Sequence, residues 1–161
     1  MRFQFLSQSF INMQRKIITN SASQTQKLGE KLAKEIFTFG GSSSTVLGLE
    51  GDLGGGKTTF LQGFAKGLGV KEKILSPTFV ILKRFQFNNL AIKQFNNFYH
   101  IDCYRISNAK EVLGLGFKKI ISDPKNIVAV EWSERIKKIL PKSAIIIKFN
   151  FVDKNKREIV I

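Results

Sequence analysis

The chain has 161 residues, 43% of them hydrophobic, which suits one globular domain with its own core. It carries 26 Lys and Arg against 12 Asp and Glu, a formal net charge of +14. A single cysteine, Cys103, excludes an internal disulfide, and the lone His100 excludes an ordinary zinc site. The sequence contains no apolar run of about eighteen residues and no secretory h-region, so we expect a cytoplasmic protein without a membrane segment.

Residues 1–12 are expected to form a flexible N-terminal extension, the alternative being an extra ordered strand. Residues 13–161 are expected to form one domain. Ser23 and Gln26 have the spacing of a capping box, and the apolar residues that follow recur at helical spacing until Gly40 and Gly41. This pattern predicts a first helix packed on a sheet.

The next segment has the spacing of a phosphate-binding loop between a strand and a helix. Residues 45–50 read as a strand, residues 51–58 match G-x-x-x-x-G-K-T, and residues 57–68 read as a helix ended by Gly69. In such a loop the glycines let backbone N–H groups turn towards phosphates, a lysine reaches the β and γ oxygens, and a hydroxyl ligates Mg²⁺. We therefore predict a nucleoside triphosphate site made by Gly54, Gly55, Gly56, Lys57, Thr58 and Thr59.

The second half of the chain predicts further strands and short helices. Strands are expected at 79–82, 90–92, 98–102, 127–130, 144–149 and 158–161, with antiparallel pairing among the first three, and helices at 107–113 and 133–140. Ser107 is the expected cap of the first of these helices. The predicted fold class is α/β, a single-domain P-loop NTPase-like fold with a central mixed β-sheet flanked by helices.

Two carboxylates are candidates for the chemistry. Glu131 follows the apolar run 127–130, and an acid at this end of a buried strand is placed to hold Mg²⁺ and to orient the attacking water. Alternation along 100–105 places His100, Asp102 and Tyr104 on one strand face. Asp102 on that face is a candidate for positioning water, and a purely structural role remains the alternative.

Two further features have open interpretations. Ser76-Pro77-Thr78-Phe79 either senses the γ-phosphate through Thr78 or is a proline turn that starts a strand. Trp132 either shields the site or is a large core residue.

Four segments together resemble the TsaE family of bacterial ATPases. They are G-D-L-G-G-G-K-T-T at 51–59, S-P-T-F at 76–79, H-I-D-C-Y-R at 100–105 and V-E-W-S-E-R at 130–135, and they occur in the family's order. The resemblance implies a small P-loop fold that uses ATP and Mg²⁺. It also implies a role in the threonylcarbamoyladenosine (t6A) modification of tRNA at adenosine 37, together with a TsaD-TsaB transferase pair.

The same resemblance assigns roles to individual residues. Lys57 is the phosphate lysine, Thr58 and Glu131 are the Mg²⁺ ligands, and Asp102 is an acid needed for hydrolysis. It also places Thr25 and Trp132 at the nucleotide. Gly55 departs from the alanine that is usual in the family, and Ser133 from a frequent proline.

Alternatives to an ATPase remain open from the sequence alone. A small-molecule kinase usually needs clustered arginines to clamp a second substrate, whereas the arginines here are dispersed. A GTPase needs an N-K-x-D motif, which is absent, so adenine is favoured over guanine. A non-catalytic, nucleotide-dependent binding module also fits the motifs. The positive charge has two open interpretations. One is a basic face for an acidic partner such as RNA (including tRNA), an acidic protein surface or phosphate ligands, and the other is a compositional background.

Overall fold

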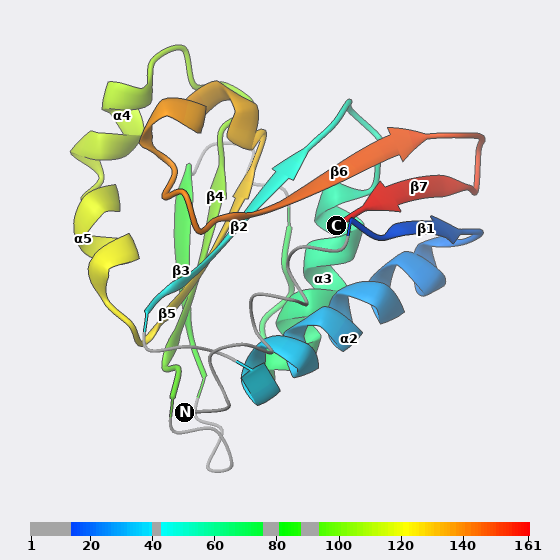
Figure 1. The fold of residues 1–161 in the computed structure, drawn as a ribbon, viewed down its shortest axis with the longest axis horizontal. Helices are drawn as coiled ribbons and strands as arrows, with labels where there is room; N and C mark the ends of the chain where they lie inside the picture. Colours follow the sequence, from blue (N-terminus) through cyan, green and yellow to red (C-terminus); the bar gives the residue numbers. More distant parts are fainter. Residues whose placement is uncertain (1–13, 40–42, 76–80, 88–93) are drawn as a thin grey trace.

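The structure is a computed structural model that describes residues 14–39, 43–75, 81–87 and 94–161. Within these residues, seven strands form one sheet with the order β1-β7-β6-β2-β5-β4-β3 (Figure 1). Strands β6, β2, β5 and β4 run parallel to one another, whereas β3 pairs antiparallel with β4, β7 with β6 and β1 with β7. The strands are β1 (Lys16–Thr19), β2 (Thr45–Glu50), β3 (Leu82–Gln86), β4 (Asn97–Asp102), β5 (Asn126–Glu131), β6 (Ile145–Phe151) and β7 (Arg157–Val160). The predicted mixed sheet is confirmed.

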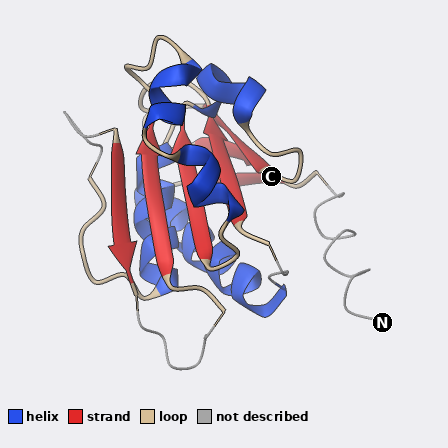
Figure 2. Cartoon of the chain, turned by 90° about the vertical axis from the view of Figure 1, so that its left-hand side faces the viewer, coloured by secondary structure: helices blue, strands red, loops and turns tan. Residues whose placement is uncertain are grey.

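Helices cover both faces of the sheet, as Figures 1 and 2 show. One face carries α2 (Ala22–Phe39) and α3 (Lys57–Leu68). The other carries α4 (Ala109–Gly114), α5 (Phe117–Ser122) and the 3₁₀ segment η1 (Ser133–Ile139). Among the described helices, none has both the length and the apolar character that crossing a membrane requires.

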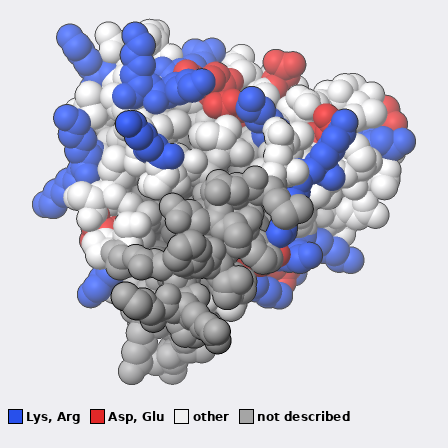
Figure 3. All heavy atoms as spheres, in the orientation of Figure 1, with Lys and Arg blue, Asp and Glu red and all other residues white. Residues whose placement is uncertain are grey.

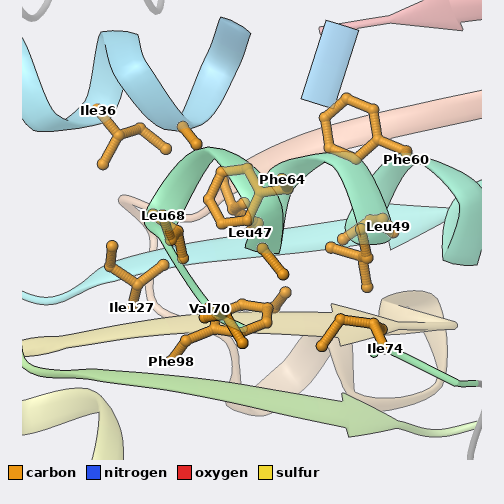
Figure 4. Close-up of a cluster of buried hydrophobic side chains, with 14 of the residues drawn as sticks. Ile36, Leu47, Leu49, Phe60, Phe64, Leu68, Val70, Ile74, Phe98 and Ile127 are labelled. Carbon is orange, nitrogen blue, oxygen red and sulfur yellow. The ribbon is translucent and has the colours of Figure 1, made fainter. Parts of the chain in front are cut away.

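The sheet separates two hydrophobic clusters. The larger lies under α2 and α3, where Phe60 and Phe64 of α3 are fully buried against the apolar side chains of β2 and β5 (Figure 4). The smaller lies under α4, α5 and η1. All six residues of β5 are buried, as expected for a central parallel strand covered on both faces. Helix α2 approaches α3 so closely that a Cβ on Gly63 would lie 1.8 Å from the Gln26 carbonyl oxygen.

Two helix starts differ from the prediction. In α2 the Gln24 N–H donates to Ser21 Oγ at 3.2 Å, and the Asn20 N–H donates to Gln24 Oε1 at 2.7 Å. The prediction that Ser23 and Gln26 cap this helix was wrong. Ser21 and Gln24 have the same spacing two residues earlier, just after the end of β1, and they make the capping contacts. In α4 the cap is Asn108 rather than Ser107, since Glu111 stands three residues after Asn108 and completes a capping box.

Other expectations fail or lie outside the described residues. Strand β1 and helix α5 were not predicted. Tyr104 does not continue β4, because the strand ends at Asp102 and the chain turns there. The N-terminal extension 1–12, the stop at Gly40 and Gly41, the segment 76–79 and the strand 90–92 lie outside the described residues.

Candidate functional site

The loop between β2 and α3 wraps around the ammonium group of Lys57. Gly54 and Gly56 have φ of 74° and 99°, a backbone region open to glycine, and Gly56 is the residue before α3. Lys57 is only 4% exposed, and its Nζ donates to the carbonyl oxygens of Gly51 at 2.5 Å and Asp52 at 2.8 Å. The start of α3 therefore presents the free amides of a first helical turn beside a buried cation, an arrangement suited to phosphate.

Burial has an electrostatic consequence for this lysine. Desolvation lowers the pKa of Lys57 below its ordinary value, and the carboxylates of Glu131, Glu134 and Asp102 oppose that shift. The ammonium also lies 4.0 Å from the centroid of the Trp132 ring, a cation–π contact. Trp132 itself has a φ of 58°, which is costly for a bulky residue. The Trp132 indole therefore lies beside the Lys57 ammonium, and its role towards a nucleotide stays a prediction.

Glu131 joins the loop to the centre of the sheet. It ends β5, is 2% exposed, and its Oε2 and Oε1 lie 2.9 Å and 3.1 Å from Thr58 Oγ1. His100 Nε2, from β4, lies 2.9 Å from Glu131 Oε1, so the same carboxylate also contacts the neighbouring strand. A hydroxyl and a carboxylate in contact are the oxygen ligands that Mg²⁺ takes together with phosphate oxygens and water. Among the described residues, no cluster of three or more His, Cys, Asp or Glu offers a separate metal site.

Asp102 ends the neighbouring parallel strand and pairs in register with Glu131. It is 8% exposed, and its Oδ1 accepts the Tyr104 N–H at 2.9 Å. Cys103 faces the smaller hydrophobic cluster, and burial, with a smaller effect from Asp102, raises the pKa of its thiol to about 12. At the end of β4, Asp102 therefore lines the site, whereas the next residue, Cys103, packs in the hydrophobic core.

A cleft of about 630 Å³ opens above these residues, a volume in the range of small-molecule sites. The cleft brings together all the predicted site residues, namely Thr25, Gly54, Gly55, Gly56, Lys57, Thr58, Thr59, Asp102, Glu131 and Trp132. The Thr25 hydroxyl lies 2.8 Å from that of Thr19, so its own bond ties α2 to β1. The fold assembles the predicted site residues in one cleft, and their roles towards a nucleotide stay predictions.

Two residues at the site were not among the predicted site residues, although Arg157 resembles a C-terminal arginine of the family. His100 was placed on the right strand face, but its bond to Glu131 depends on β4 and β5 being neighbours. Arg157 comes from β7, about a hundred positions from the loop, and its Nε donates to the Gly54 carbonyl oxygen at 3.0 Å. No local pattern in the sequence marks either contact, because both arise from strand order.

Comparison with known proteins identifies relatives. The family model described as "Threonylcarbamoyl adenosine biosynthesis protein TsaE" matches residues 19–159. A Rickettsia felis protein named as a tRNA threonylcarbamoyladenosine biosynthesis protein TsaE is 34% identical over 88% of this chain and 75% of its own length. A Bacillus subtilis protein of the same name is 40% identical over 71% of this chain and 66% of its own length. The crystal structure of Bacillus subtilis YdiB matches with a TM-score of 0.70 and 30% identity, covering 92% of this chain and 84% of that one. The chain belongs to the TsaE family of threonylcarbamoyl adenosine biosynthesis proteins.

Proposed function

We propose that the chain is a Mg²⁺-dependent ATPase that takes part in forming threonylcarbamoyladenosine in tRNA. The observation that carries the proposal is the joining of Lys57, Thr58 and Glu131 at one end of the cleft. A buried cation, a helix start and a hydroxyl–carboxylate pair form a set that suits a triphosphate and its metal. The names of the relatives, which refer to this tRNA modification, support the biological context.

Each residue has a distinct task in this proposal. Lys57 binds the β- and γ-phosphates, and the amides of residues 57–59 face the same anion. Thr58 and Glu131 would hold Mg²⁺, which supplies neutralisation of the charge on the transferred phosphoryl group. His100 keeps the Glu131 carboxylate in place. Asp102, beside Glu131, orients the attacking water.

Family membership also suggests the partners. We propose that the chain acts with TsaD-like and TsaB-like proteins, and that its hydrolysis of ATP supports their repeated cycles rather than building the modified base. Direct contact with tRNA through the basic surface is a separate proposal, supported by the net charge of +14.

Two linked measurements test the function. The first is phosphate release from ATP by the purified chain, alone and with the TsaD-like and TsaB-like proteins of the same organism, with and without Mg²⁺. The second is the threonylcarbamoyladenosine content of tRNA, by mass spectrometry, in cells depleted of the chain and complemented with it. We expect Mg²⁺-dependent release and restored modification. Nucleotide binding without release under all of these conditions would indicate a binding module instead.

A further inference from the structure

Arg157 connects the hairpin of β6 and β7 to the phosphate loop. It begins β7, and its NH1 donates to the carbonyl oxygens of Asp153 at 2.7 Å and Lys156 at 2.9 Å, which fixes the guanidinium on its own turn. Its Nε donates to the Gly54 carbonyl oxygen at 3.0 Å, and the guanidinium carbon lies 4.7 Å from the centroid of the Phe151 ring. These three carbonyl oxygens and the Phe151 ring restrict the movement of the Arg157 guanidinium.

The peptide that Arg157 contacts is held at both ends. Its carbonyl, from Gly54, accepts from Arg157, and its N–H, from Gly55, donates to the Asp52 carbonyl oxygen at 3.1 Å. The same Asp52 oxygen accepts from Lys57 Nζ at 2.8 Å. One peptide and one carbonyl therefore link Arg157 to the phosphate lysine, and hydrogen bonds in such a chain polarise one another.

The stem of Arg157 also borders the loop. A Cβ built on Gly56 would lie 3.6 Å from Arg157 Cγ and 3.7 Å from Thr25 Cγ2, so these two side chains flank the last glycine before Lys57. Gly54 and Gly56 both have positive φ, and glycines lose much conformational freedom when a loop is ordered. Contacts that order the loop before binding reduce the conformational entropy that the loop loses when an anion binds.

We infer that Arg157 is a positioning residue that holds the phosphate loop in the shape that binds a nucleoside polyphosphate. The inference rests on the proposed function, because it assumes that phosphates bind at this loop. Arg157 acts through the Gly54–Gly55 peptide, so its contribution scales with the phosphates of the ligand and is absent for a ligand that lacks them.

Calorimetry with Arg157→Gln tests this role, using ADP, a non-hydrolysable ATP analogue with Mg²⁺, and adenosine. Loss of a hydrogen bond from a charged donor predicts about tenfold weaker binding of both nucleotides. Adenosine binding and the melting temperature should match those of the control. Arg157→Lys keeps the stem and the charge but lacks the planar fork, and we expect a loss of about threefold. In turnover assays the KM for ATP should rise while kcat is retained.

The matched control is Arg84→Gln. Arg84 lies on β3, and it donates from Nε and NH2 to Asn97 Oδ1 at 3.0 Å and 2.8 Å, away from the cleft. Nucleotide affinities of Arg157→Gln and Arg157→Lys equal to those of Arg84→Gln would overturn the inference while leaving the ATPase proposal intact. An equal loss for adenosine and ATP would also overturn it. Failure of the wild-type chain to bind any nucleotide would overturn both proposals.

Discussion

Lysines in two regions of this protein have opposite surroundings. Lys57 lies 4% exposed between two carbonyl oxygens and an indole ring. On the opposite face of the sheet, exposed lysines gather over α4, α5 and η1 (Figure 3). We call this set the basic flank; it comprises Lys110, Lys118, Lys119, Lys125, Lys137, Lys138 and Lys142. In the part of the chain that the structure describes, none of its ammonium groups lies within ion-pair distance of a carboxylate.

The difference shows that charge alone does not define a site. A desolvated cation with fixed acceptors interacts strongly with an incoming anion, because water no longer screens it. An exposed lysine keeps its hydration and its side-chain freedom, and it contributes mainly to long-range attraction. Substitutions at the site and on the basic flank test how far this contrast holds.

The largest effect is expected from Lys57→Ala. In the proposed mechanism the buried ammonium makes charge-assisted contacts to the transferred phosphoryl group, so we expect kcat/KM for ATP to fall about 10³-fold while the fold is kept. The assay is phosphate release, with circular dichroism as the check on folding. Lys66→Ala is the matched control, since Lys66 is on the same helix but exposed, in an ion pair with Glu30 at 3.5 Å. Equal activity of the two variants would remove Lys57 from the mechanism.

Asp102→Asn should separate hydrolysis from binding. The amide keeps an oxygen for the Tyr104 N–H but cannot act as a base, so we expect kcat to drop about 10²-fold with nucleotide affinity nearly unchanged. Asp123→Asn is the control, because Asp123 likewise accepts an N–H two residues on, from Lys125 at 2.9 Å, but on the far face. A parallel loss of affinity and turnover in Asp102→Asn would point to a structural role.

The pKa of Lys57 measures how strongly this lysine is desolvated compared with the exposed lysines of the basic flank. Because burial lowers its pKa in the folded protein, the unfolded chain binds more protons between that pKa and the ordinary value of 10.5. The contribution of Lys57 to the unfolding free energy therefore rises with pH in this window, while phosphate affinity falls as the ammonium is lost. NMR of ¹³C-labelled lysines, with Lys57→Arg to assign the resonance, should give a midpoint below 10.5. A midpoint above that value would mean that Lys57 is not desolvated.

The smallest effect is expected from the basic flank. Replacing Lys118 and Lys119 by Gln should change the unfolding free energy by less than about 0.5 kcal/mol, because both are exposed, and should leave ATP hydrolysis unchanged. For tRNA association, each lysine that no longer neutralises a phosphate reduces the slope of log affinity against log salt by about one. A flat salt response of the wild-type chain would assign the charge to compositional background.

Much of this protein could be predicted from local pattern. The strand, loop and helix around Lys57 follow from glycine spacing and apolar periodicity, and the buried strand before Glu131 follows from a continuous apolar run. The cap of α2 was misplaced because two Ser and Gln pairs share one spacing, and only the end of β1 selects Ser21. Short elements such as β1 and α5 carry too few residues for a periodic signal.

The sequence by itself determined which groups are available for chemistry, since the G-x-x-x-x-G-K-T spacing dictates a local backbone shape that needs few distant contacts. Only the tertiary structure decided which groups meet. The order β2-β5-β4 places Thr58, Glu131 and His100 in one bonded row, and the return of β7 places Arg157 on the Gly54 carbonyl. The physical reason is that strand order is set by how the whole chain buries its apolar faces, and no short stretch of sequence contains that information.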